Sequence, residues 1–180
     1  SMHVVVRPID NCYLDQMIKG WRERHGNCVI NKKTTPAVEL VELLRKGESV
    51  GFLLDQNRPR GEAVFVDYFG RPAATHKGLA ILALRTKAPV VPVFMIRQKE
   101  GHRMIIEKPL VLTRTGTLKR DIVEATALFT RKIESYVRRY PDHWLWVHRR
   151  WKTTPPHPSL IRLGNPTKVI NGSGGSGSER

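Results

Sequence analysis

The chain has 180 residues, 40% of them apolar, so it is long enough to bury one core and is expected to form a single domain. Its 31 Lys and Arg residues outnumber its 16 Asp and Glu residues and give a net charge of +15, which predicts an anionic partner such as a phosphate group, a nucleic acid or a membrane surface. Two cysteines argue against a disulfide framework, and no apolar run reaches the roughly 18 residues of a membrane span.

The first third of the chain alternates short apolar runs with amphipathic segments. Apolar runs predict strands, and apolar residues that recur every three or four positions predict helices. In chain order the sequence predicts a strand at 3–6, a helix from a cap at Asp10 or Asn11 to about Arg24, a strand at 28–30, a helix at 36–46 and a strand at 50–54 that is covered on both faces.

The rest of the chain continues the alternation. After a loop to about residue 73, Thr75 is expected to cap the helix HKGLAILALRTK, and residues 90–97 (VVPVFMIR) predict a third buried strand. Gly101 is expected to turn the chain into a hairpin, and residues 121–140 predict a long amphipathic helix.

These elements predict an α/β fold with a mainly parallel sheet flanked by helices. One domain is expected over residues 1–154. The composition then changes to repeated prolines and the segment NGSGGSGSER, so residues 155–180 are expected to be a flexible tail rich in Pro, Gly and Ser.

Polar side chains follow the strand at 50–54 directly, in the stretch LLDQNRPRG. Asp55, Gln56, Asn57 and Arg58 stand where a parallel strand would end, and Arg7 stands at the end of the first strand. Ligands of open α/β sheets bind beyond the carboxyl ends of the strands. If the two strands are neighbours, the Arg7 guanidinium and the polar stretch share one cleft.

Two interpretations of these residues stay open. The plain one is that Asp55 and Gln56 cap the sheet while the arginines are solvated. The functional one is that the arginines grip a phosphate, with Gly70, Thr75 and a helix N-terminus nearby to accept an anion. The sequence contains none of the glycine-rich phosphate loops or serine nucleophile motifs that would indicate another enzyme class.

The block RRYPDHWLWVHRRWK, residues 138–152, is dense in Arg and Trp. This composition is shared by membrane-interface anchors and by platforms that bind single-stranded nucleic acid. An ordinary core strand with a basic rim would also fit. The block alone does not decide between these interpretations.

Four stretches, in their order and at their intervals, carry a resemblance to a known family. They are HVVVRPIDN, GFLLDQN, VFVDYFGRPAATHKGLAILALRTKAPVVPVF and HWLWVHRRWKT. Together they resemble the lipid A biosynthesis acyltransferases, the late acyltransferases of the lysophospholipid acyltransferase superfamily, over residues 3–154. The resemblance implies an acyltransferase-like fold.

The resemblance implies transfer of a fatty acyl chain from acyl carrier protein, or from coenzyme A, to a hydroxyl of a lipid A precursor in lipopolysaccharide biosynthesis. The expected place is the cytoplasmic face of the bacterial inner membrane, on an anionic surface, and no metal or other cofactor is expected. Family members use a His-x4-Asp/Glu motif, in which the histidine is the general base. In the family this motif lies upstream of the arginine that Arg7 matches, so the fold is expected to lack its N-terminal part and the chain to be inactive alone.

The resemblance also implies roles for individual residues, all on the acceptor side of the site. Arg7 is expected to be catalytic, stabilising charge on the acyl carbonyl or gripping a sugar phosphate. The expected substrate-binding residues are Asp55, Gln56, Asn57, Arg58, Phe69, Gly70, Thr75, Arg149 and Arg150.

One pair, His102 and Glu107, has the His-x4-Glu spacing. It falls in an expected hairpin strand, where residues five apart point to opposite faces, so the two side chains are not expected to cooperate. The competing functions are a basic nucleic-acid-binding domain, which the net charge of +15 and the Arg- and Trp-rich block motivate, and a non-catalytic module that binds anionic lipid. No nucleic-acid partner is expected.

Overall fold

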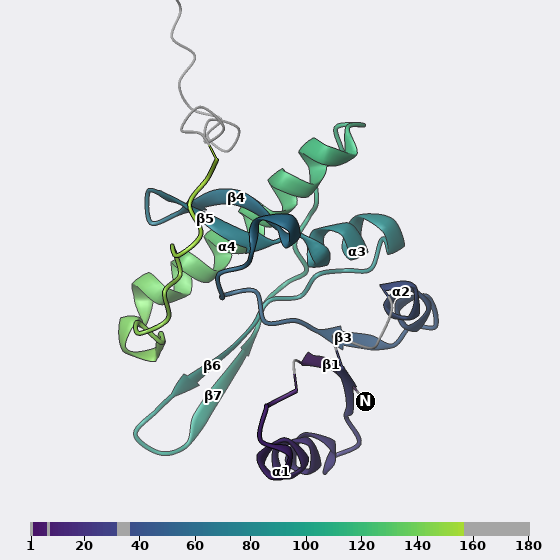
Figure 1. Ribbon diagram of the computed structural model, residues 1–180, viewed down its shortest axis with the longest axis vertical. Helices are drawn as coiled ribbons and strands as arrows, with labels where there is room; N and C mark the ends of the chain where they lie inside the picture. Colours follow the sequence, from purple (N-terminus) through teal and green to yellow (C-terminus); the bar gives the residue numbers. More distant parts are fainter. Residues whose placement is uncertain (1, 7, 32–36, 157–180) are drawn as a thin grey trace, which may run out of the picture.

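The computed structural model describes residues 2–6, 8–31 and 37–156. Its first part is a parallel sheet of three strands with the order β2-β1-β3, in which β1 covers Met2–Val6, β2 covers Cys28–Asn31 and β3 covers Ser49–Gly51. Helix α1 (Cys12–Glu23) connects β1 to β2, and helix α2 (Ala37–Arg45) lies between β2 and β3 in the chain (Figure 1).

Local sequence signals explain where these helices begin and end. The Asn11 side chain accepts hydrogen bonds from the N–H groups of Tyr13 and Leu14, at 3.0 and 3.2 Å, so the predicted cap of α1 is confirmed. Gly47 has φ +81° just after α2, a left-handed conformation that glycine adopts at little cost. The strand predicted at 50–54 is confirmed in part: β3 ends at Gly51, and the chain after it is not covered on both faces, because Leu53 is exposed while Leu54 is buried.

A tight hairpin follows, and here the prediction was wrong. Strands β4 (Ala63–Tyr68) and β5 (Arg71–His76) pair antiparallel, after the short 3₁₀ helix η1 (Arg60–Glu62). Thr75 lies within β5 and caps no helix; helix α3 begins later and covers Gly78–Thr86. Because the turn at Phe69 and Gly70 does not have a common hairpin sequence, residues 55–73 were predicted to be a loop and not two paired strands.

The predicted hairpin around Gly101 is confirmed, with β6 over Val93–Arg97 and β7 over His102–Ile106. Strand β6 is not buried on both faces as predicted, because Val93 and Met95 point to solvent while Ile96 is buried. Of the seven strands in the described ranges, four therefore pair antiparallel, in two hairpins. The fold is mixed α/β, and the parallel arrangement is limited to the sheet of three strands.

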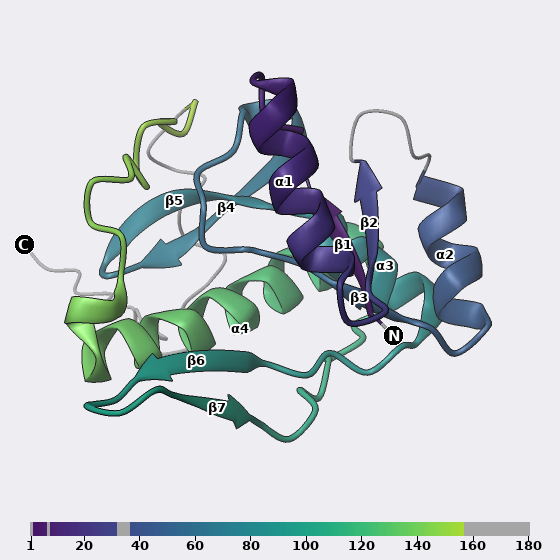
Figure 2. The same ribbon diagram turned by 90° about the horizontal axis from the view of Figure 1, so that it is seen from below.

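Helix α4 (Leu118–Arg139) is the longest element of the described structure, as the amphipathic pattern predicted. Figures 1 and 2 show it between the β4–β5 hairpin and the β6–β7 hairpin. Its buried Ala125 and Phe129 pack with Leu54 and Ala80 in one apolar cluster. A second cluster, around Ile30, Leu40, Val41 and Leu82, joins the parallel sheet to α2 and α3.

After α4 the chain forms the 3₁₀ helix η2 (Pro141–His143) and then a series of turns to residue 156. The block at 138–152 thus forms no strand in the described structure, which removes the interpretation of a core strand. Most of the predicted tail, residues 157–180, lies outside the described residues. Within the described ranges, no helix is both long enough and apolar enough to cross a bilayer.

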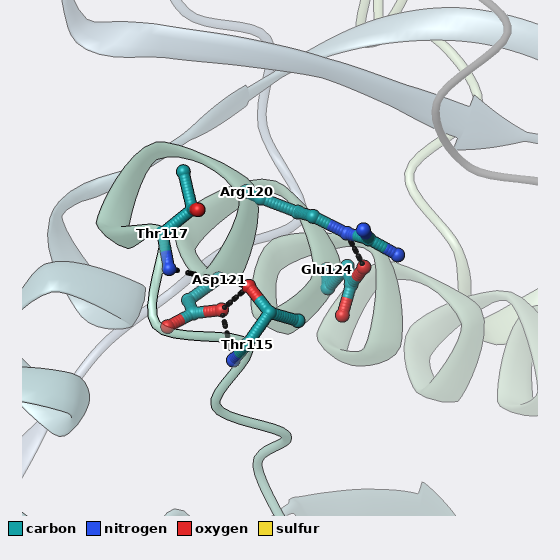
Figure 3. A network of polar contacts seen from close by, with 5 residues as sticks. All are labelled: Thr115, Thr117, Arg120, Asp121 and Glu124. Atoms are coloured by element: carbon teal, nitrogen blue, oxygen red, sulfur yellow. Dashed lines mark hydrogen bonds and ion pairs between the residues drawn. The ribbon is translucent and has the colours of Figure 1, made fainter.

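The start of α4 is fixed by a polar contact that Figure 3 shows. The buried Asp121 carboxylate accepts hydrogen bonds from the Thr115 hydroxyl at 2.6 Å and from the Thr115 N–H at 2.7 Å. These two bonds, with the hydroxyl as the larger contribution, hold the pKa of Asp121 below its ordinary value. The contact closes the turn that leads into the helix.

We expect Asp121→Ala to lower the midpoint of thermal unfolding by about 2–4 °C at pH 7, since it removes the acceptor of both bonds. The lowered pKa means that this stabilisation is present above the unfolded-state pKa of about 3.9 and is lost as the pH falls through the folded-state pKa. The unfolding midpoints of the parent and of Asp121→Ala, both measured by circular dichroism, should therefore converge in strong acid. Glu124→Ala, which breaks only an exposed pair with Arg120, is the control and should change little; equal losses in both variants would contradict the assignment.

Candidate active site

The polar stretch after β3 lies at the edge of the parallel sheet where ligands are expected. Strands β1 and β3 are parallel neighbours, with Met2 opposite Ser49 and Val4 opposite Gly51, so both carboxyl ends lie at one edge. This is the arrangement that a shared cleft requires. Arg7 itself lies outside the described residues, and its position relative to Asp55 stays a prediction.

An apolar cavity of about 290 Å³ opens beside this stretch. Phe52, Leu53 and Leu54 form one wall, and Asp55 places a carboxylate in the same lining. The other walls come from β6 and from α4 and its C-terminal end, through Phe94, Ile96, Phe129, Lys132, Ile133, Tyr136, Val137, Tyr140, His143 and Trp144. A mostly apolar hollow with a few polar groups is typical of sites for small amphiphilic ligands.

The residues 148–154, here called the C-terminal strap, hold the polar stretch in place. The N–H of Asn57 donates to Nε2 of His148 at 2.9 Å. The side chain of Asn57 donates to the Thr153 hydroxyl at 3.0 Å and accepts from the Thr153 N–H at 3.2 Å. Arg60 Nε donates to the carbonyl of Thr154 at 3.1 Å. The strap therefore engages the backbone N–H and both side-chain polar atoms of Asn57.

Arg150 is the centre of the strap and is 2% exposed. Its guanidinium donates to the Ala74 carbonyl at 2.9 Å and to the Thr75 hydroxyl at 2.5 Å. The Ala74 carbonyl also accepts the N–H of Arg58 at 3.2 Å. The polar stretch, β5 and the strap thus meet at one peptide group.

The electrostatics around Arg150 are those of a buried cation. Burial lowers the pKa of Arg150, and the neighbouring Tyr68 and Asp55 oppose that change. Burial also raises the pKa of Tyr68, whose ring lies 5.2 Å from the guanidinium carbon. Arginine keeps its proton at neutral pH in proteins, so Arg150 provides a fixed positive charge near Asp55.

Phe69 and Gly70 form the turn of the β4–β5 hairpin and do not line the cavity. Both have positive φ, 56° and 75°, as a two-residue turn that matches the strand twist requires. This conformation is strained for phenylalanine. The N–H of Phe69 donates to the Glu134 carboxylate at 2.9 Å, and Arg138 covers the ring at 4.4 Å. These contacts with α4 offset the strain.

The structure brings together part of the predicted set. Asp55, Asn57, Arg58, Thr75 and Arg150 lie in one neighbourhood, joined by the contacts described above. Gln56 is exposed beside them, and Arg149 is exposed on the strap. Arg150 and Thr75 make their contacts with atoms of the protein, so direct contact of either with a substrate stays a prediction.

Several residues of this site were missed. Lys132, Tyr136 and Tyr140 line the cavity from α4, and their spacing of four residues, on the face that also carries Ile133 and Val137, could have identified them. His148 and Thr153 gave no comparable signal, because they contact Asn57 from 91 and 96 residues away along the chain.

The pair His102 and Glu107 is separated by the length of β7. Glu107 accepts a hydrogen bond from Tyr136 at 2.7 Å and lies 2.6 Å from Lys132 Nζ, and these bonds lower its pKa. His102 is exposed at the opposite end of the strand. In the described part of the chain no cluster of three or more His, Cys, Asp or Glu side chains is suited to a metal ion.

Comparison with known proteins gives one consistent family. The family model described as bacterial lipid A biosynthesis acyltransferase matches residues 1–153. A lipid A biosynthesis palmitoleoyltransferase from Escherichia coli (strain K12) is 29% identical over 165 residues, which is 90% of this chain and 52% of the relative. A lipid A biosynthesis lauroyltransferase from the same strain is 31% identical over 156 residues, with 84% and 48% covered. A lipid A biosynthesis acyltransferase from Haemophilus influenzae is 28% identical, with 87% and 50% covered. The chain therefore spans about half the length of these relatives.

The contacts of Arg150 predict a strong effect on stability. We expect Arg150→Ala to lower the free energy of unfolding by about 2–4 kcal/mol, since it leaves the Ala74 carbonyl and the Thr75 hydroxyl with fewer partners and opens a space beside Tyr68. Urea unfolding followed by tryptophan fluorescence measures this. Arg149→Ala removes the same side chain from the neighbouring exposed position and should cost less than about 0.5 kcal/mol. Similar values for the two variants would show that the guanidinium of Arg150 is not what holds the strap.

Proposed function

Because the chain belongs to the bacterial lipid A biosynthesis acyltransferase family, we propose that it serves the transfer of a fatty acyl chain from a thioester donor to a hydroxyl of a lipid A precursor. The donor is acyl carrier protein or coenzyme A. The observation that carries the proposal is the family match over residues 1–153, which includes the polar stretch, the hairpins and the strap. The names of the relatives specify palmitoleoyl, lauroyl and myristoyl groups for those proteins.

The cavity beside Asp55 supports this function physically. An acyl chain gains about 0.8 kcal/mol for each CH₂ group that leaves water, and the walls formed by Phe52, Leu54 and Phe129 provide an apolar surface for it. Asp55 and Lys132 lie in the same lining and provide polar contacts for the head of the molecule. A molecule with a long apolar part and a polar, reacting end fits such a site.

We carry the residue roles over from the family resemblance. Arg7 stabilises the charge that develops on the acyl carbonyl, or binds a phosphate of the sugar, as a guanidinium does with two parallel hydrogen bonds. Asp55 orders the polar end of the pocket, with Gln56 and Arg58 beside it. Arg149 is free to reach an anionic group because it is exposed on the strap.

As the family resemblance implies, we assign the general base of the proposed reaction to a His-x4-acid pair. Within the 180 residues, His102 and Glu107 alone have this spacing. Residues on a strand rise by about 3.3 Å each, so their backbones lie roughly 16 Å apart, which is too far for one carboxylate to orient one imidazole. The reaction is placed at the cytoplasmic face of the bacterial inner membrane, on an anionic surface.

Asp55→Asn, made in the natural full-length polypeptide, should lower kcat by about 100-fold, since a misplaced substrate costs about that factor. The measurement is the rate of transfer from an acyl carrier protein thioester to a lipid A precursor, followed by mass spectrometry. The variant should stay folded with a somewhat lower midpoint of thermal unfolding, because the Asp55 charge offsets part of the cost of burying Arg150, whereas the hydrogen bonds to the strap are made by Asn57 and Arg60. Unchanged kcat in a folded variant would remove Asp55 from the site.

The 180-residue chain by itself should bind the lipid A precursor and produce no acylated product, for lack of the base. Calorimetric titration measures the binding, and mass spectrometry of an overnight reaction measures the product. Product formation that His102→Ala abolishes would assign the base to His102. Salt-sensitive binding of oligonucleotides, with no binding of the precursor, would favour a nucleic-acid-binding domain and refute the proposed function.

A further inference from the structure

The turn after η2 presents three consecutive apolar side chains to solvent. Leu145 is 68% exposed, Trp146 is 55% exposed and Val147 is 84% exposed. Apolar residues are common singly on protein surfaces, but a contiguous group marks an interaction site. This turn is part of the Arg- and Trp-rich block whose role the proposed site does not explain.

Hydrogen bonds hold this turn in shape, so the exposure is built into the fold. The Trp146 indole N–H donates to the Pro141 carbonyl at 2.7 Å, and the N–H of His148 donates to the Leu145 carbonyl at 3.0 Å. The indole ring also lies near Phe69, with 6.3 Å between the ring centres. Trp146 is therefore fixed on one side, and Leu145 and Val147 have no comparable contact to bury them.

Exposed cationic side chains lie on the segments next to the turn. The β6–β7 hairpin reaches it, because the N–H of Arg97 donates to His143 Nε2 at 3.0 Å and Arg103 donates to the Tyr140 hydroxyl at 3.3 Å. Figures 1 and 2 both show the hairpin turn on the same side of the molecule as the C-terminal end of α4. The exposed cations of this region are Arg97, Lys99, Arg103, Arg138, Arg139 and Arg149, and the exposed acids are Glu100 and Asp142.

The same region adjoins the cavity. Tyr140, His143 and Trp144 line the hollow beside Asp55 and lead directly into the exposed turn. A lipid that leaves a bilayer at this point would meet apolar wall along its path to the polar stretch. Neither an oligonucleotide nor a soluble acidic protein needs such a continuous apolar surface.

We propose that Leu145, Trp146 and Val147, together with the surrounding cations, form a docking surface for an anionic phospholipid bilayer. The apolar side chains enter the boundary between head groups and acyl chains, where tryptophan is favoured, and the arginines bind the lipid phosphates. The inference deepens the proposed function and rests on it in one respect. The proposed function supplies the purpose of docking, which is to place the cavity over the lipid substrate.

The test is cosedimentation of the 180-residue chain with sucrose-loaded vesicles of phosphatidylcholine, either pure or with one quarter phosphatidylglycerol. We expect the chain to bind the anionic vesicles with an affinity about tenfold or more higher than the neutral ones. Addition of 0.5 M NaCl should weaken the binding to the anionic vesicles. Leu145→Asp with Val147→Asp should weaken binding to the anionic vesicles about tenfold or more, because apolar insertion is lost. Arg97→Gln with Lys99→Gln should weaken it by a smaller factor and reduce its dependence on salt.

The matched control is Tyr13→Asp with Leu14→Asp on α1, a helix that is also exposed and apolar but lies away from the C-terminal end of α4 (Figures 1 and 2). It should bind anionic vesicles as the parent does. The proposal is overturned if this control alone loses binding, if the parent binds neither vesicle, or if the parent binds acyl carrier protein and not vesicles. Circular dichroism confirms that each variant is folded. The assay involves no acyl transfer, so its failure and a failure of the proposed function are separate results.

Discussion

The arrangement of this site depends on one buried cation. The Arg150 guanidinium sits behind Asp55 with almost no exposure to water, although burying a charge costs several kcal/mol when nothing compensates. Two hydrogen bonds to β5, the face of Tyr68 and the negative potential of Asp55 provide the compensation. The buried Nε atom of Arg150 has no hydrogen-bond partner among the described residues, so the compensation is partial. Because the partners come from separate segments, this compensation is present only when the polar stretch, the hairpin and the strap are all in place.

This dependence explains why two motifs that stand far apart in the chain form one unit. The Asp-Gln-Asn-Arg stretch carries the groups expected to face a substrate, and the His-Arg-Arg segment carries the groups that hold it, through Asn57, Ala74 and Thr75. The chain thus separates contact with substrate from support of the contacting loop. Thr75 and Arg150, which the family resemblance associates with substrate, lie in the supporting layer, whereas Arg149 faces outward.

Local patterns predicted the elements whose signals are local. The Asn11 cap, the glycine after α2, the Gly101 hairpin and the amphipathic α4 each depend on a few neighbouring residues. The β4–β5 hairpin was missed because its turn places a phenylalanine, not a second glycine, in the left-handed region. Strand β6 was predicted to be buried because its residues are uniformly apolar, yet only one face packs on α4. The position of Asp55 just beyond the end of a strand was predictable from the apolar run before it. Its neighbours on the strap depend on tertiary packing, which no short sequence pattern encodes.

The carbonyl of Ala74 accepts one hydrogen bond from the backbone of Arg58 and one from the Arg150 guanidinium. A shared acceptor links the motions of its two donors, so a displacement of the loop by an incoming molecule would pull on the strap as well. Since the exposed Leu-Trp-Val turn leads directly into His148 at the start of the strap, a molecule in the pocket would act on the conformation of that turn through Ala74 and through the contacts of Asn57 with His148 and Thr153.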